Sequence, residues 1–367
     1  MRSPQLRDKP MIKLLIVDDS ALMRRQLMVL FQAEGDFEVR QARNGDEAVR
    51  ENREFEPHVV TLDINMPEMD GLTALSLIMA ERPVAVVMVS SLTNEGALAT
   101  FEALNLGAVD FVAKPGGTIS LSIDKIAAEL VSKVRSAARA RPRNRVSTAG
   151  ALARRMQEER KKASQASAAL AAPRGTSDGL VVMGASTGGP RALEIVLSGL
   201  AANFPWPVLV AQHMPGAFTR AFADRLDQLC ALQVVEAGSA LAIEAGKIYI
   251  GRGGADMVLA NRAGRLTVLP TPENSNYLWH PSVELLGRSV LEHYDPRRVT
   301  AVLMTGMGYD GSDAFSEIKK RGGRTIAESE ESAVVYGMPA ELVGKGGASL
   351  VLAIEKIAAQ VSAWAGR

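Results

Sequence analysis

Apolar and polar residues alternate along the first third of the chain in short runs that predict strands separated by helices. Strands are predicted at the apolar runs 12–17, 38–41, 59–62, 84–89 and 110–113. Between them apolar positions recur with the helical period, as at 22–31, where Leu27, Leu30 and Phe31 share one face, and at 47–53. This alternation is typical of a parallel sheet covered by helices.

A second alternation begins after residue 178 and predicts a larger unit. Its strands are predicted at 180–183, 207–211, 234–236, 247–250 and 299–304. The runs 256–260 and 265–269 are joined by Asn261, Arg262, Ala263 and Gly264, and they predict an antiparallel hairpin because asparagine and glycine tolerate positive φ. We therefore expect a doubly wound, mostly parallel α/β domain with an antiparallel hairpin at the edge of the sheet.

The segment between these units differs in composition. From Arg135 to Arg174 the chain is rich in Ala, Ser and Arg, and Glu158 and Glu159 are its only acidic residues. This composition predicts a basic linker, partly helical near 151–162, and a solvated tether is favoured over contact with nucleic acid or anionic lipid. The expected divisions are an extension at 1–10, a first domain at 11–134, a linker at 135–178 and a second domain at 179–367.

Composition limits the class of protein. The chain has 367 residues, 47% of them hydrophobic, and a net charge of +1. No apolar run approaches the roughly 18 residues of a membrane span, and the first ten residues are too polar for a signal peptide. The single cysteine, Cys230, cannot form an internal disulfide. We expect a cytoplasmic protein without membrane insertion.

Charged and polar side chains end four of the five strands in the first unit. Asp18 and Asp19 follow the first strand, Asp63 the third, Ser90 the fourth and Lys114 the fifth. The carboxyl ends of parallel strands share one edge, where converging carboxylates favour a bound Mg²⁺. Asp63 is then suited to accept a phosphoryl group whose oxygens are neutralised by Lys114 and bonded by Ser90. Helix capping explains Asp18 or Asp19 alone, but not the whole set.

The motifs around these positions resemble the receiver domain of two-component response regulators, which has a flavodoxin-like (βα)5 fold. They are VDDS at 17–20, LDINMP at 62–67, MDG at 69–71 and FVAKP at 111–115. The resemblance implies that Asp63 is the phosphorylated residue and that Ser90 and Phe111 form a switch pair. It further implies Mg²⁺ ligation by Asp19, Asp63 and the Asn65 carbonyl, with Asp18 binding through water.

Three polar residues of the second unit also follow predicted strands. Ser186 lies in GASTGGP, 184–190, on a turn from strand to helix, where glycines leave space and the helix is expected to direct N–H groups. His213 follows 207–211, and Asp310 follows 299–304. Taken singly, these residues fit a phosphate-binding turn, a hydrogen-bonded histidine and a cap of the helix at 311–320. Together they favour a nucleophile, its base and an orienting carboxylate.

The order Ser, His, Asp differs from that of the α/β-hydrolases, and the hydrolase elbow GxSxG is absent. The domain instead resembles the CheB chemoreceptor methylesterases through 184–190, QHMP at 212–215, PSV at 281–283, TGMGYDG at 305–311 and VYGMP at 335–339. The resemblance implies a nucleophilic Ser186, a general base and acid at His213 and an orienting Asp310. It also implies that the Met307 N–H lies in the oxyanion hole and that Thr187 supports the histidine.

The implied function is phosphorylation-activated hydrolysis of glutamate γ-methyl esters on methyl-accepting chemotaxis receptors, releasing methanol, together with deamidation of specific glutamines. These reactions on the receptors would produce adaptation in chemotaxis. The implied phosphodonor is the histidine kinase CheA, and Mg²⁺ is expected for phosphorylation but not for the esterase step. Tyr309 and Glu284 depart from the usual family pattern, as does the missing proline at 251–254.

The receiver-like first unit is also compatible with two other classes of function. A DNA-binding regulator is disfavoured because the output segment lacks a compact helix-turn-helix pattern, so no DNA partner is expected. A catalytically silent, phospho-dependent receptor-binding protein is the remaining alternative.

Overall fold

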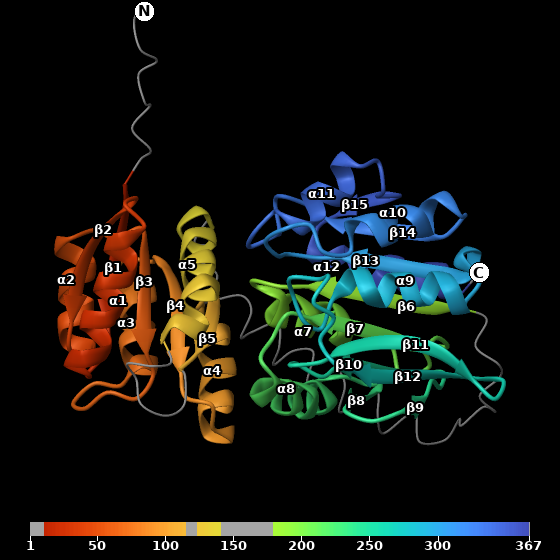
Figure 1. The fold of residues 1–367 in the computed structure, drawn as a ribbon, viewed down its shortest axis with the longest axis horizontal. Coiled ribbons are helices and arrows are strands. Elements are labelled where there is room, and N and C mark those ends of the chain that lie inside the picture. Colours follow the sequence, from red (N-terminus) through yellow and green to blue (C-terminus); the bar gives the residue numbers. More distant parts are fainter. Residues whose placement is uncertain (1–10, 115–122, 141–178, 367) are drawn as a thin grey trace, which may run out of the picture. The chain divides into compact units, whose positions relative to one another are not determined.

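The computed structural model describes residues 11–114, 123–140 and 179–366. It divides the chain into two compact units, Met1–Val146 and Ser147–Arg367 (Figure 1). The expected extension at 1–10, Pro115 and the linker residues 141–178 lie outside the described residues.

The first unit is built on a five-stranded parallel sheet. Its strands are β1 (Ile12–Val17), β2 (Phe37–Ala42), β3 (Val59–Asp63), β4 (Ala85–Ser90) and β5 (Asp110–Ala113). Their order is β2-β1-β3-β4-β5, with every pair parallel. This is the flavodoxin-like order, so the predicted (βα)5 fold is confirmed. The strand order reverses at β1, and the carboxyl ends of its parallel neighbours β1 and β3 lie side by side.

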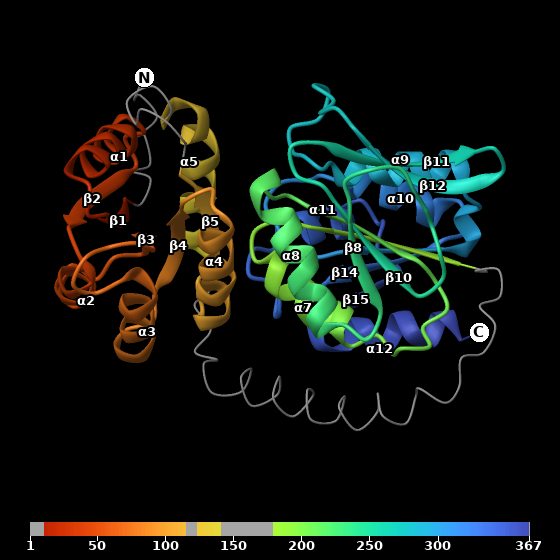
Figure 2. The same ribbon diagram turned by 90° about the horizontal axis from the view of Figure 1, so that it is seen from below.

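Within the described residues of this unit, five helices cover the sheet. They are α1 (Ala21–Ala33), α2 (Gly45–Glu54), α3 (Gly71–Glu81), α4 (Asn94–Leu106) and α5 (Ile123–Arg139). Figure 2 shows α1 and α5 on one face and α2, α3 and α4 on the other. The helix α5 continues past residue 134, and Arg135 pairs with Asp36 at 2.7 Å and with Glu34 at 2.8 Å. Arg135 therefore belongs to the first unit, although its charge had placed it in the linker.

The second unit contains a seven-stranded parallel sheet. Its strands are β6 (Leu180–Ala185), β7 (Val208–Gln212), β8 (Gln233–Ala237), β10 (Lys247–Gly251), β13 (Val299–Leu303), β14 (Arg324–Glu328) and β15 (Leu350–Leu352). The order is β15-β14-β13-β6-β7-β10-β8. The chain moves outward from β6 in one direction through β7 and in the other through β13. The strand order therefore reverses at β6, which is where doubly wound sheets bind their ligands.

Helices lie on both faces of this sheet. They are α7 (Gly189–Ser198), α8 (Gly216–Leu229), α9 (Val283–His293), α10 (Ser312–Lys320), α11 (Met338–Gly344) and α12 (Ile354–Ala365), with a short 3₁₀ helix, η2 (Pro296–Arg298), before β13. Figure 2 shows α9 and α10 on one face and α7 and α12 on the other. The core between α9, α10 and the sheet includes Val283, Leu286 and Phe315, all fully buried.

The predicted hairpin forms, but not at the edge of the main sheet. The strands β11 (Asp256–Arg262) and β12 (Arg265–Thr271) pair antiparallel, and β12 also pairs with β9 (Leu241–Ala242) in a separate three-stranded sheet. The expectation of an antiparallel edge strand was wrong, because buried Met257 and Leu259 pack into the core beside α9. The turn residues with positive φ are Ala263 (49°) and Gly264 (80°), rather than Asn261.

Candidate active site and acidic cluster

The turn that carries Ser186 lies between the ends of two neighbouring strands. The Ser186 N–H donates to the Thr305 carbonyl at 2.9 Å on the β13 side. On the other side the His213 N–H donates to the Ala185 carbonyl at 3.1 Å. These hydrogen bonds continue the β13-β6-β7 ladder past the strand ends. The predicted convergence of Ser186 and His213 at this sheet edge is therefore present in the backbone.

Glycine is needed at two positions around Ser186, one in the turn that follows it and one in the loop after β13. Gly188 has a φ of 78°, which side-chain residues rarely adopt, and a Cβ on Gly306 would lie 2.7 Å from the Ser186 Cβ. The first N–H group of the helix is not directed at the serine hydroxyl, contrary to the expectation from the sequence. The Gly189 N–H donates instead to the Ser186 carbonyl at 2.7 Å, and Pro190 has no N–H.

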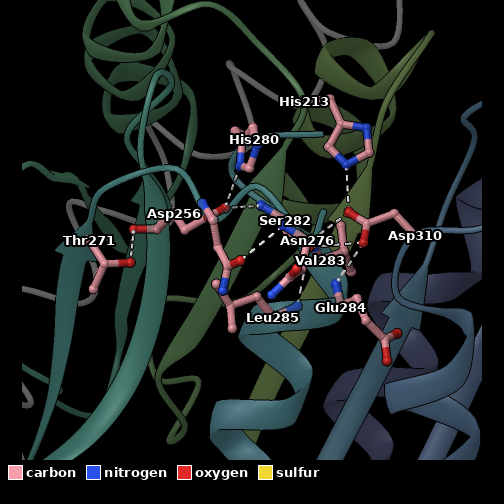
Figure 3. Close-up of polar contacts among 11 residues, drawn as sticks. His213, Asp256, Thr271, Asn276, His280, Ser282, Val283, Glu284, Leu285 and Asp310 are labelled. Carbon is pink, nitrogen blue, oxygen red and sulfur yellow. Dashed lines mark hydrogen bonds and ion pairs between the residues drawn. The ribbon is translucent and has the colours of Figure 1, made fainter. Parts of the chain in front are cut away.

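Asp310 is a buried carboxylate that accepts hydrogen bonds from four donors (Figure 3). The donors are His213 Nε2 at 2.8 Å, Ser282 Oγ at 3.0 Å, Val283 N at 2.6 Å and Glu284 N at 2.9 Å. The alternative that Asp310 caps the helix that follows it is wrong, because the N-cap of α10 is Gly311, which has no side chain. Asp310 binds the N-terminus of α9 instead.

Glu284 completes an exchange of caps between α9 and α10. Its Oε2 accepts the Ala314 N–H at 2.9 Å, so a carboxylate of α9 holds the N-terminus of α10 while Asp310 holds the N-terminus of α9. Burial raises the pKa of Glu284, partly offset by the Ala314 N–H. This departure from the family pattern therefore has a structural function at the site, since it fixes the two helices against each other.

The surroundings of Asp310 favour its charged form. Burial by itself raises the pKa of a carboxyl group, but the hydrogen bond and charge of His213 and the N–H donors of Glu284 and Val283 outweigh it. The pKa of Asp310 therefore lies below its usual value. A carboxylate that stays ionised can fix the tautomer of the histidine beside it and offset a positive charge that develops there.

The hydrogen bond to Asp310 assigns the two nitrogens of the His213 ring. An ionised carboxylate only accepts, so His213 Nε2 carries the proton and Nδ1 bears a lone pair in the neutral ring. Nδ1 is buried and has no hydrogen-bond partner among the described residues. The atom of His213 that is available as a base is therefore Nδ1.

Two further residues hold this pair, and the sequence interpretation gave them no function. Trp279 stacks on the His213 ring with centroids 5.7 Å apart and planes 5° apart. Ser282 is fully buried and donates to Asp310, while its oxygen accepts the Leu285 N–H at 3.2 Å as the N-cap of α9. Ser282 is thus a support for Asp310. A serine before the helical pattern of Val283, Leu285 and Leu286 signals a helix start, but not this contact.

Thr305 holds the turn after Ser186 through hydrogen bonds. Its carbonyl accepts the Ser186 N–H, its hydroxyl donates to the Thr187 carbonyl at 2.8 Å, and its N–H donates to buried Glu328 at 2.8 Å. The Thr187 backbone is therefore fixed, while the expected support of His213 by Thr187 stays a prediction. Met307 lies in the segment that follows β13, and its assignment to the oxyanion hole also stays a prediction.

The first unit brings its predicted charged residues together. Carboxylate oxygens of Asp18, Asp19 and Asp63 lie within 4.8 Å of one another. Lys114 Nζ lies 2.9 Å from Asp18 Oδ2 and 2.8 Å from Asp63 Oδ2. The helix cap beside them is Ser20, whose hydroxyl accepts the Met23 N–H, so neither Asp18 nor Asp19 caps α1.

The charge balance of this cluster fits a divalent cation. Three carboxylates face one ammonium group, and oxygen donors are the ligands that Mg²⁺ prefers. Burial raises the pKa of Asp63 to about 6 although Lys114 opposes the shift, and the neighbouring Asp18 adds to it. An uncompensated carboxylate of this kind is what a cation would stabilise. The residues present are consistent with a Mg²⁺ site.

The expected switch pair, Ser90 and Phe111, lies on the neighbouring strands β4 and β5. Ser90 is fully buried, and its hydroxyl donates to the Gly96 carbonyl of α4 at 3.1 Å. Phe111 is also buried and meets Phe101 edge to face at 6.5 Å. Their roles in switching stay predictions. Across the described part of the chain, no helix combines the length and the apolar character needed to cross a membrane.

Comparisons with known proteins identify a known family for each of the two units. Residues 14–123 match the response regulator receiver domain family, and residues 181–361 match the CheB methylesterase family. A protein-glutamate methylesterase/protein-glutamine glutaminase 3 of Rhodospirillum rubrum is 54% identical over 361 residues, covering 97% of each chain. A similarly named protein of Rhodopseudomonas palustris is 53% identical over 96% of this chain and 98% of its own. The crystal structure of the Thermotoga maritima CheB methylesterase catalytic domain is 35% identical and covers 52% of this chain and all of that one, with a TM-score of 0.50.

Proposed function

This chain belongs to the CheB family of protein-glutamate methylesterase/protein-glutamine glutaminases with a receiver domain, and from that membership we propose how its residues carry out and control the reaction. The activity is hydrolysis of glutamate methyl esters and of glutamine side-chain amides in proteins, and it serves adaptation in chemotaxis. The observation that carries the mechanism is the bond from His213 Nε2 to Asp310, which leaves the buried Nδ1 as the free base.

Ser186 is the nucleophile of this mechanism. Its Oγ attacks the acyl carbon of the substrate side chain while its proton passes to His213 Nδ1. Asp310 holds the ring in the required tautomer and stabilises the imidazolium that forms, because four hydrogen bonds keep its charge in place. The Met307 N–H is assigned to the oxyanion of the tetrahedral intermediate, and Thr187 supports the histidine.

Collapse of the intermediate breaks the bond to the leaving group. His213 returns its proton to the departing methoxide as methanol, or to the amine as ammonia, and an acyl-enzyme on Ser186 remains. Water then attacks the acyl carbon with His213 Nδ1 again as base, releasing glutamate. The ester and the amide differ only in the leaving group, so one set of residues serves both substrates.

Control is assigned to the first unit. Asp63 is the phosphorylated residue, and Ser90 and Phe111 respond to the new charge. Asp19, Asp63 and the Asn65 carbonyl would hold Mg²⁺, with Asp18 bonding through water, and the ion would neutralise phosphoryl oxygens when bound. Lys114 contributes a fixed positive charge to the same oxygens. Phosphorylation raises the esterase activity.

The partners follow from the same assignment. The substrates are methyl-accepting chemotaxis receptors, whose methylated side chains lie in the cytoplasm, where we place this enzyme. The phosphodonor is a histidine kinase of the CheA type. No DNA partner is assigned.

Methanol release from methylated receptor membranes tests the proposal. The full chain is assayed with and without acetyl phosphate, beside the variants Ser186→Ala and Ser239→Ala, the second of which alters an exposed serine in a turn. We expect acetyl phosphate to stimulate release, Ser186→Ala to abolish it and Ser239→Ala to leave it unchanged. Equal release by the Ser186→Ala variant would show that the nucleophile is assigned wrongly. Receptor binding without release by the parent chain would instead support the silent binding protein.

A further inference from the structure

The loop between β12 and α9 touches both members of the histidine and aspartate pair. We call residues 274–282 the strap. Trp279 of the strap covers the face of the His213 ring, and Ser282 at its end donates to Asp310. A shift of the strap would therefore move the ring of the general base and remove a donor from its carboxylate at the same time.

The strap itself is held by Asp256, a carboxylate that the mechanism does not use. Asp256 opens β11 and is 1% exposed. Its Oδ1 accepts His280 Nδ1 at 3.0 Å and the Ser282 N–H at 2.7 Å, and its Oδ2 accepts the Asn274 N–H at 2.9 Å. Figure 3 shows Asp256 on one side of Ser282 and Asp310 on the other. One carboxylate thus fixes both ends of the strap.

We propose that Asp256 is a positioning residue for catalysis, which holds the strap so that Trp279 and Ser282 fix His213 and Asp310 in their reactive geometry. The inference rests on the proposed function, because it assumes that His213 and Asp310 act on the substrate. Asp256 acts through these residues and is not assigned a contact with substrate. Residue 282 joins the two carboxylates directly, since its N–H binds Asp256 and its hydroxyl binds Asp310.

The chemistry of the three donors explains why a carboxylate is needed. All three groups bound to Asp256 donate, and an ionised carboxylate can accept from each of them. An asparagine offers one oxygen and one NH₂ group. With its oxygen at the Oδ1 position it keeps His280 and Ser282, but its NH₂ then opposes the Asn274 N–H. The variant Asp256→Asn thus releases one end of the strap, and Asp256→Ala releases both.

Kinetics of methanol release by the full chain give the first readout. Misplacing a catalytic group by about 1 Å costs on the order of 100-fold in rate, so we expect kcat to fall about 100-fold in Asp256→Ala and about 10-fold in Asp256→Asn. KM should change less than about threefold, because the strap positions the base rather than the bound receptor. The matched control is Asp227→Ala, since Asp227 accepts the Val234 N–H at 2.7 Å and so also holds a loop, away from the site. Its kcat should equal that of the parent.

Fluorine NMR of the chain labelled with 5-fluorotryptophan gives the second readout, which a general loss of stability would not reproduce. The chain has three tryptophans, Trp206, Trp279 and Trp364, which Trp→Phe variants assign. We expect Asp256→Asn to shift or broaden the Trp279 signal alone. The other two should not move, because Trp206 packs on Phe204 and Trp364 on Arg324.

The outcomes separate the two proposals. An Asp256→Asn enzyme with parental kcat, with an unmoved Trp279 signal, or with all three signals displaced would overturn the positioning role. Should Ser186→Ala retain activity, the proposed mechanism would fail, while the Trp279 signal would still report whether Asp256 holds the strap. A loss of kcat in Asp256→Asn together with a change confined to Trp279 supports the inference.

Discussion

The variant Asp63→Asn is expected to stabilise the first unit in the absence of divalent cations. Asp63 is 3% exposed, and its pKa is raised from 3.8 to about 6. The main cause is burial, which the charge of Lys114 only partly offsets. The surroundings therefore disfavour the charged side chain on balance. Asparagine has nearly the same shape without the charge, and its amide oxygen can still accept from Lys114.

The size of the effect follows from the shift. A difference of about 2 units at about 1.4 kcal/mol per unit corresponds to roughly 3 kcal/mol, which is an upper limit because asparagine makes a weaker bond to Lys114. Because the folded pKa is raised, the native state retains the proton to higher pH than the unfolded state. Stability from this group is therefore present below about pH 4 and is lost as pH rises through about 6. The gain in Asp63→Asn should be full at pH 7.5 and about a third as large at pH 4.5.

Hydrogen exchange of the full chain in EDTA measures this effect locally. The free energy of opening is followed for peptides from β1 and β3, with peptides from β6 and β13 as an internal reference. Glu38→Gln removes a charge from an exposed position of β2 and should change nothing beyond about 0.5 kcal/mol. Added Mg²⁺ should stabilise the parent more than the variant. A variant less stable than the parent at pH 7.5, or equally stabilised at both pH values, would refute the reasoning.

Three other changes have expected outcomes. Asp310→Asn should lower kcat for methanol release by about 10³- to 10⁴-fold with little effect on KM, because the amide cannot accept from all four donors. A loss of kcat below tenfold would contradict the role of the carboxylate. Tyr309→Ala should raise KM for methylated receptors several-fold while kcat stays within about twofold, since the ring is 52% exposed and meets Trp279 edge-on at 5.3 Å. A large fall in kcat with an unchanged KM would instead place Tyr309 in the chemical step. Glu328→Ala should lower the free energy of unfolding by about 1–3 kcal/mol by leaving the Thr305 N–H unpaired, whereas Glu328→Gln should lower it less. Thermal melts that show equal destabilisation by the two variants would contradict this explanation.

Much of the fold was predictable because the period of apolar residues records burial directly. The runs 12–17 and 110–113 coincide with β1 and β5, and the helix predicted at 22–31 lies within α1. The charged cluster of the first unit could be predicted from the parallel pairing of its strands. Parallel strands end at one edge, so Asp18, Asp63 and Lys114 had to approach one another once the sheet was parallel.

Other elements left weaker traces in the sequence. The edge strand β15 has only three residues, which are largely exposed, and it was not predicted. The hairpin was predicted, but its place in a separate sheet depends on packing beside α9, which no local pattern encodes. A helix boundary was missed for a similar reason. The basic character of Arg135 indicated a linker, while its partners Glu34 and Asp36 lie far back in the chain.

The sequence by itself determined which polar residues stand at strand ends, and hence that Ser186, His213 and Asp310 belong to one edge. Only the tertiary structure decided that Asp310 binds the N-terminus of α9 and that His213 is left with Nδ1 as its free base. The tertiary structure also decided that Trp279 stacks on His213 and that Asp256 binds the strap. The physical reason is that periodicity reports whether a side chain is buried. Hydrogen bonds between remote residues depend on how helices and loops pack, and that packing leaves no period in the chain.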